Sequence, residues 1–165
     1  MLKLCCSVLT VAVLAASPGI ASAQEQSKAP AGANAYFVNL HDGDTVTSPF
    51  KVNFGLTPNM GIAPSGVEKT GVGHFHLLVD TKLTAEEMTQ PIMVDEHHIH
   101  FGKGQIETML TLPPGTHTLQ VMLGDWTHIP FSPPVQSELI TITVKAGDGE
   151  AKNAEPAGHS MAVAH

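Results

Sequence analysis

Two His-x-His pairs lie about twenty residues apart in this chain. GHFHLL holds His74 and His76, and HHIHFG holds His98 and His100. Successive side chains of a β-strand point to opposite faces, so both imidazoles of a pair share one face, with Cα atoms roughly 6.6 Å apart. Neutral imidazole is a good ligand for zinc, copper, iron and nickel. The spacing predicts a metal site if the two pairs point at the same place.

Other donors lie near these pairs in the sequence. His128 follows the strand-like LQVMLGD and is a fifth candidate ligand. Several carboxylates could ligate or could orient a ring nitrogen, and two methionines are soft donors that would favour copper, although packing is the simpler role for methionine. These residues are Asp80, Asp95, Glu96, Glu107, Met60 and Met122. The expected set is therefore a copper or zinc ion bound by His74, His76, His98, His100 and His128.

Two other hypotheses remain open for the histidines. They could hydrogen-bond across strands in a metal-free module that binds a ligand or a protein of the cell envelope. A metal-dependent enzyme would need an open coordination position and a general base. The sequence contains neither a nucleophile elbow nor an H-E-x-x-H helix. We therefore favour a binding role over catalysis.

The elements that must position these side chains are β-strands. Apolar residues alternate with polar ones in short segments separated by turns such as HDGD and LPPG. About seven short strands predict an antiparallel, immunoglobulin-like β-sandwich, with a barrel or jelly roll as alternatives. One helical turn is expected at the capping box Thr84-x-x-Glu87. The clearest strand patterns span 35–40, 51–56, 74–81, 105–112, 117–125 and 137–145.

Charge and cysteine content exclude several functions. The formal net charge is −7, and all eight basic residues are Lys. An acidic chain without Arg is a poor match for nucleic acid or for clustered phosphates. The two cysteines, Cys5 and Cys6, lie in the N-terminal apolar run, which leaves the rest of the chain without thiolate ligands or nucleophiles.

The chain divides into four segments. Residues 1–23 carry a Lys, an apolar run and Ala21-Ser22-Ala23, the pattern of a secretory signal peptide cleaved after Ala23. Residues 24–33 are expected to be a flexible lead-in, 34–145 the β domain and 146–165 a disordered tail. The sequence thus predicts a periplasmic or secreted protein with no membrane span in the mature chain.

Several motifs together resemble a known family. GVGHFHLLVD, HIHFGKGQIET, LPPGTHTLQVMLGD and SPPVQSELITITV occur in this order. They resemble a bacterial family of secreted domains classed as domain of unknown function 4399. The resemblance implies an exported β-rich domain with no assigned activity. The family pattern tends to have a third histidine where this chain has Phe75.

Overall fold

The computed structural model describes residues 25–147, which form two β-sheets. The smaller sheet has three strands, and each neighbouring pair is antiparallel. In spatial order these strands are β1 (Ala35–Phe37), β3 (Phe50–Leu56) and β7 (Glu107–Leu110).

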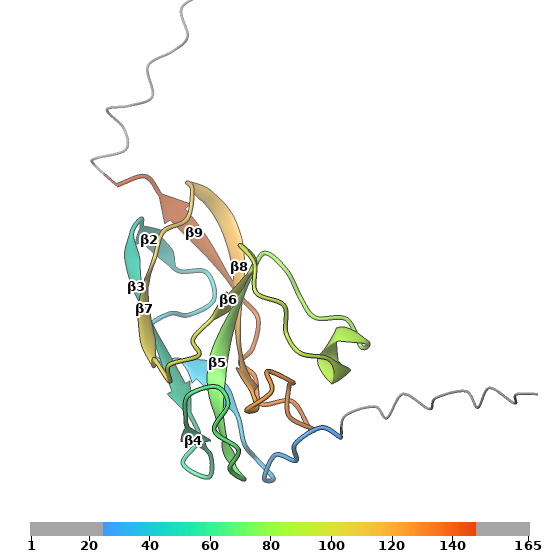
Figure 1. The fold of residues 1–165 in the computed structure, drawn as a ribbon. Helices are drawn as coiled ribbons and strands as arrows, with labels where there is room; N and C mark the ends of the chain where they lie inside the picture. The colour runs from blue at the N-terminus through green and yellow to red at the C-terminus, as the bar shows by residue number, and fades with distance from the viewer. Residues whose placement is uncertain (1–24, 148–165) are drawn as a thin grey trace, which may run out of the picture.

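The larger sheet is built around β5, which is central and pairs with three other strands (Figure 1). One edge of β5 is bonded to β8, and the other edge is shared by β4 near its start and by β6 further along. The pairs β2–β9 and β4–β5 are parallel, and the remaining pairs are antiparallel. The strands are β2 (Thr45–Thr47), β9 (Ile140–Lys145), β8 (Gly115–Gly124), β5 (Val72–Val79), β4 (Gly61–Ile62) and β6 (His98–His100).

The inner faces of the two sheets share one hydrophobic core. Phe75 of β5 is fully buried, and its ring centroid lies 5.2 Å from that of Phe54 on β3. Phe101, directly after β6, packs on the same Phe54 ring at 4.8 Å. Alternate residues of β5 and β8 complete this core: Phe75, Leu77, Val79, Leu119, Val121 and Leu123. The residues between them must therefore point to the opposite face of the larger sheet.

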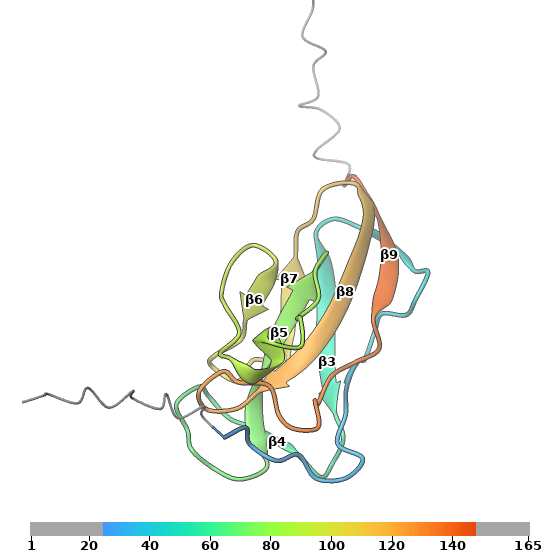
Figure 2. The same cartoon turned by 90° about the vertical axis from the view of Figure 1, so that its right-hand side faces the viewer.

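That opposite face is also covered by protein. The segment between β5 and β6 carries a short 3-10 helix, η1 (Glu87–Thr89), and the segment after β8 crosses the same side (Figure 2). A second apolar cluster forms beneath them from Leu78, Ile92 and Met122. β5 is consequently buried on both faces, which explains its nearly continuous apolar sequence.

The expected all-β class is confirmed, but the expected strand number and pairing are not. The described region has nine strands instead of about seven, and its larger sheet is mixed rather than purely antiparallel. The two strands that were missed, β2 and β4, have three and two residues. Both pair in parallel, β2 with the distant β9 and β4 with β5, the next strand along the chain. Segments this short have no readable period, because their pairing depends on tertiary context.

The capping box is present as expected. The Thr84 N–H donates to Glu87 Oε2 at 2.7 Å, and the Glu87 N–H donates to Thr84 Oγ1 at 3.3 Å. These reciprocal hydrogen bonds close the turn that leads into η1, whose N-cap residue is Glu86.

The N-terminal segment, expected as a flexible lead-in over 24–33, is tied to the domain. The Ala29 N–H donates to the Ser132 carbonyl, and the Ser132 N–H donates to the Ser27 carbonyl, at 3.0 and 2.9 Å. The signal peptide expected at 1–23 and nearly all of the tail expected at 146–165 lie outside the described residues. Within residues 25–147, no helix is long and apolar enough to cross a membrane.

Candidate metal centre

Strand parity and register bring three of the predicted histidines together. His74 and His76 lie on β5 with side chains on the face opposite Phe75, and both are fully buried. His100 on β6 pairs directly with His76. Directly opposed side chains on paired strands are close neighbours. One ligand nitrogen from each of His74, His76 and His100 lies within 4.8 Å of the other two.

The rings of these three histidines form a compact group. The His74 and His76 Nε2 atoms are 3.1 Å apart. The ring centroid of His74 is 4.9 Å from that of His76 and 4.9 Å from that of His100, and the His76 and His100 centroids are 5.0 Å apart. The imidazoles therefore surround a common point, although they come from two strands.

His128 completes a group of four rings. Its centroid lies 4.8 Å from His100, 4.9 Å from His74 and 5.9 Å from His76. It sits in a loop with a backbone φ of 73°, which is uncommon for a residue with a side chain. Two hydrogen bonds fix this backbone: the His128 N–H donates to the Asp125 carbonyl, and the His128 carbonyl accepts from the Ile92 N–H. Such a conformation persists only where the surroundings determine it.

The structure does not bring His98 into this group. His98 lies opposite Leu78, two cross-strand pairs beyond the pair of His76 and His100. Its Nδ1 is 2.8 Å from Asp95 Oδ1, and the same oxygen accepts the His98 N–H. His98 and His100 alternate with Ile99 as the His-x-His motif predicts. His98 nevertheless lies two residues further along the strand, where its ring contacts Asp95 instead of the other histidines.

Three ring nitrogens of the group have no hydrogen-bond partner among residues 25–147 although they are buried. They are His74 Nδ1, His76 Nδ1 and His100 Nε2. Buried polar atoms are normally satisfied, because leaving one unpaired costs about 1–3 kcal/mol. No carboxylate in the described region bonds to these three rings, in contrast to many metal-binding histidines. The described side chains alone therefore leave the hydrogen-bonding capacity of the group unfilled.

Burial keeps the imidazoles neutral. It lowers the pKa of His74 to about 4, with repulsion from His128 and His100 adding to the effect and the Asp125 charge opposing it. Burial and then the neighbouring His74, His100, His128 and His98 lower the pKa of His76 to about 2. The pKa of His100 is also lowered, first by burial and then by His128. Neutral imidazole is the form that binds a metal ion.

Two glycines make room for the rings. A Cβ on Gly102 would lie 2.6 Å from His100 Nε2, and a Cβ on Gly124 would lie 2.9 Å from His76 Nε2. Gly124 lies opposite His74 in the β5–β8 register, beside the group. Neither glycine has a positive φ, so it is space rather than backbone freedom that requires glycine here.

The other predicted donors are engaged elsewhere. Asp80 bonds to His117, Asp95 to His98 and Glu107 to Lys51, and Glu96 lies 3.7 Å from His97. Met60 belongs to the main core, and Met122 packs with Leu78 and Ile92. The group in the described region is therefore formed by imidazole rings.

One further histidine outside the group, His117, is held by a carboxylate and a carbonyl oxygen. The residue is buried, with Nδ1 2.7 Å from Asp80 Oδ2 and Nε2 2.9 Å from the Pro113 carbonyl oxygen. Asp125 was not singled out from the sequence at all. It is buried and organises the turn that carries His128. The only signal for it was its place in LGDWTH, between a buried strand and a candidate ligand.

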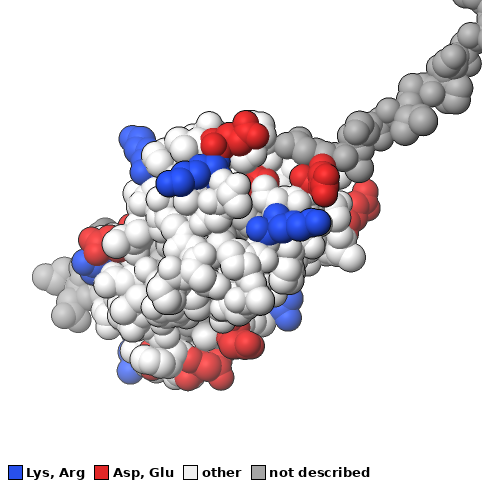
Figure 3. All heavy atoms as spheres, turned by 90° about the horizontal axis from the view of Figure 1, so that it is seen from below, with Lys and Arg blue, Asp and Glu red and all other residues white. Residues whose placement is uncertain are grey.

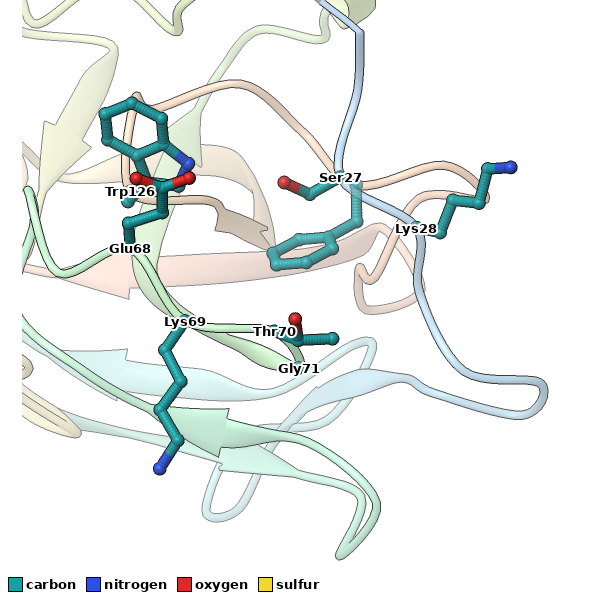
Figure 4. A pocket seen from close by; sticks show the side chains of 8 residues that line it. Ser27, Lys28, Glu68, Lys69, Thr70, Gly71 and Trp126 are labelled. Carbon is teal, nitrogen blue, oxygen red and sulfur yellow. The ribbon is translucent and has the colours of Figure 1, made fainter.

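A separate cavity of about 210 Å³ lies beside this turn (Figure 4). Trp126 and Glu68 lie on one side of it and Ser27 on the other, while the amines of Lys28 and Lys69 point away. None of the four clustered histidines lines it. On the face of the molecule seen in Figure 3, acidic and basic side chains are interspersed around an uncharged area, so this face carries no basic stripe for nucleic acid.

Comparison with known proteins places the chain in a family without giving it an activity. No curated protein and no solved structure matches it. A family model described as "Domain of unknown function (DUF4399)" matches residues 52–145, which is more than half of the 165-residue chain and includes all four clustered histidines. The chain therefore belongs to the DUF4399 family.

Proposed function

We propose that this protein binds a copper or zinc ion through His74, His76 and His100, with His128 as the fourth ligand. The observation that carries the proposal is convergence: ligand nitrogens of the first three residues lie within 4.8 Å of one another, and the His128 ring lies beside them. His98 is left out of the ligand set.

The donor chemistry supports zinc or copper over hard cations. Imidazole nitrogen suits these two metals, whereas magnesium and calcium prefer oxygen ligands. Two nitrogens bound to one tetrahedral zinc at about 2.05 Å would be about 3.3 Å apart. The separation of 3.1 Å between the Nε2 atoms of His74 and His76 is close to that value.

We further propose that this domain is an exported, immunoglobulin-like sandwich that handles metal in the periplasm or outside the cell. The two sheets with a shared core support the sandwich, and Ala21-Ser22-Ala23 after an apolar run supports export. An envelope protein is the natural partner for metal transfer in that compartment.

Calorimetric titration of residues 24–165 with Zn²⁺ and with Cu²⁺ tests the proposal. One equivalent is expected to bind, and His76→Ala with His100→Ala is expected to abolish binding. His41→Ala is the matched control, because this side chain is 78% exposed and distant in sequence from the cluster. No binding by the unaltered chain, or binding unchanged in the double variant, would refute the proposal.

A metal-free module is the second candidate. It is favoured by the 3.1 Å contact between the His74 and His76 Nε2 atoms, which is also a hydrogen-bond distance if the two rings are opposite tautomers. Nitrogen-15 NMR of the imidazoles distinguishes the two proposals. Fixed, opposite tautomers that do not change when Zn²⁺ is added would support the metal-free module.

A further inference from the structure

The carboxylate of Asp125 lies at the centre of the loop that carries His128. Its Oδ1 accepts hydrogen bonds from the Thr127 N–H at 2.8 Å, the Thr127 hydroxyl at 2.7 Å and the Ile129 N–H at 3.1 Å. Asp125 is only 3% exposed, although aspartate is rarely this buried without partners. One buried side chain thus satisfies three donors of this turn.

The backbone of Asp125 closes the same turn. Its N–H donates to the Ile129 carbonyl, and its carbonyl accepts from the His128 N–H, both at 2.9 Å. His128 is held between these bonds at a φ of 73°. Since an uncommon backbone conformation needs such support, the position of the His128 ring depends on the Asp125 contacts.

The N-terminal segment forms hydrogen bonds to this turn and to the neighbouring segment. The Ser27 hydroxyl donates to Asp125 Oδ2 at 2.7 Å. The Gln26 side-chain amide donates to the Pro130 carbonyl at 3.0 Å and to the Met88 carbonyl at 2.7 Å. Residues 26 and 27 therefore connect both segments that cover the histidine face, the one after β5 and the one after β8. Figure 4 shows Ser27 close to the 125–131 turn.

We propose that Asp125 is the positioning residue of the histidine centre. Its carboxylate holds the turn that presents His128 to His74 and His100, and Ser27 of the N-terminal segment clamps that carboxylate. This inference rests on the proposed metal binding and adds the residues that set the strength of the site.

A double-variant cycle between Asp125 and His128 tests the inference. Asp125→Ala and His128→Ala are each expected to weaken Zn²⁺ binding about 10- to 100-fold. The combined variant should bind no more weakly than His128→Ala alone, because Asp125 acts through that ring. In the Cu²⁺ form, electron paramagnetic resonance should show one imidazole fewer for Asp125→Ala. Asp44→Asn is the control, since that carboxylate accepts the His41 N–H in an exposed turn.

Two milder variants keep the test decisive if Asp125→Ala does not fold. Asp125→Asn keeps an acceptor for the turn but removes the charge, and Ser27→Ala removes only the clamp. Both are expected to weaken Zn²⁺ binding less than Asp125→Ala, and Ser27→Ala should speed the loss of Zn²⁺ to a chelator. Trp126, the single tryptophan of the chain, follows Asp125 and reports the order of the turn by fluorescence.

The outcomes separate the two proposals. Binding by the unaltered chain, with Asp125→Ala unchanged in affinity or additive with His128→Ala, overturns the positioning role and leaves the metal site intact. No binding by the unaltered chain overturns both proposals.

Discussion

The His74 Nε2 atom lies 3.1 Å from the His76 Nε2 atom, with both rings buried on one face of β5. Two residues apart on a strand, side chains usually run parallel instead of turning their tips together. Here the tips meet, while the Nδ1 atom of each ring has no hydrogen-bond partner among residues 25–147. The pair therefore presents adjacent nitrogen lone pairs or protons to one point, beside His100 and His128.

The two histidines of β6 are expected to differ in their effect on metal binding. His100→Ala should weaken Zn²⁺ binding by at least about tenfold, equivalent to 1.4 kcal/mol, because it removes a ligand. His98→Ala should change it less than about threefold, because His98 is bonded to Asp95. Calorimetry of both variants measures the difference. Equal losses would place His98 in the site and would contradict the geometry described above.

Gly124→Ala and Gly102→Ala test the space around the rings. A Cβ at either position overlaps an imidazole nitrogen, and His76 cannot move away because it is fully buried. We expect Gly124→Ala to destabilise the protein by about 1–3 kcal/mol and to weaken metal binding. Gly102→Ala should act more on binding than on stability, since His100 is only partly buried.

Gly61→Ala is the matched control for these glycine variants. Its Cβ would lie 3.2 Å from the Val72 side chain and 3.9 Å from the Gly71 carbonyl oxygen, and the residue has no positive φ. Urea unfolding and Zn²⁺ titration of the three variants measure the outcome. Normal affinity in Gly124→Ala would show that the His76 ring is free to shift.

The sequence predicted those features that follow from the alternation of side chains along a strand. Parity alone placed His74 and His76 opposite Phe75, and this is how they lie. This alternation does not determine the register between two paired strands. The pairing of His76 with His100, and of Leu78 with His98, decides which histidine enters the group. A shift of two residues would exchange them without changing any local pattern.

The loop contributions were harder to foresee. His128 was a candidate, but the position of Asp125 in LGDWTH does not show that its carboxylate holds the turn, or that Ser27, 98 positions away, bonds to that carboxylate. His117 follows the turn LPPGT, which does not indicate that its side chain is buried. Its partner Asp80 is 37 positions distant, at the end of β5. These contacts depend on the tertiary fold, which propensity and spacing do not encode.

Acid is expected to destabilise the metal-free protein through the buried histidines. Their pKa values in the fold, about 4 for His74 and about 2 for His76, lie below the usual value of 6.5. Between these values and 6.5 the unfolded chain binds more protons than the folded one, so the free energy of unfolding falls as the pH is lowered through this window. Above about pH 6.5 these histidines are neutral in both the folded and the unfolded chain, so they no longer make the free energy of unfolding depend on pH.

Urea unfolding of the metal-free protein at pH 7, 6 and 5 checks this prediction. The same series on His76→Gln should show a weaker dependence on pH, because glutamine does not titrate. His41→Gln, at an exposed position, is the control. An equally steep dependence in His76→Gln would attribute the acid sensitivity to other groups.

The Asp80–His117 pair is expected to stabilise the fold with the opposite dependence on pH. Burial alone would lower the pKa of His117, but hydrogen bonds to Asp80 and to the Pro113 carbonyl, with the Asp80 charge, raise it above its usual value. Burial would raise the pKa of Asp80, and the bonds to His117 and to the Thr118 N–H outweigh it and lower that pKa. The stabilisation from His117 is complete below pH 6.5 and is lost as the pH rises through its raised pKa. That from Asp80 is lost as the pH falls below about 3.8.

A double-variant cycle with Asp80→Asn and His117→Gln measures this pair. Asparagine tolerates the positive φ of 56° at residue 80, so the substitution removes the charge and one of the two acceptor oxygens without straining the backbone. The coupling energy at pH 5.5 should be about 1 kcal/mol, near the upper end for ion pairs open to solvent, because the Asp80 side chain is 36% exposed. This coupling energy should be smaller at pH 9.

The His41–Asp44 pair, separated by 3.6 Å and more exposed, is the control and should show a coupling below about 0.5 kcal/mol. A coupling that grows from pH 5.5 to pH 9 would contradict the charged state of His117 that its two acceptors require.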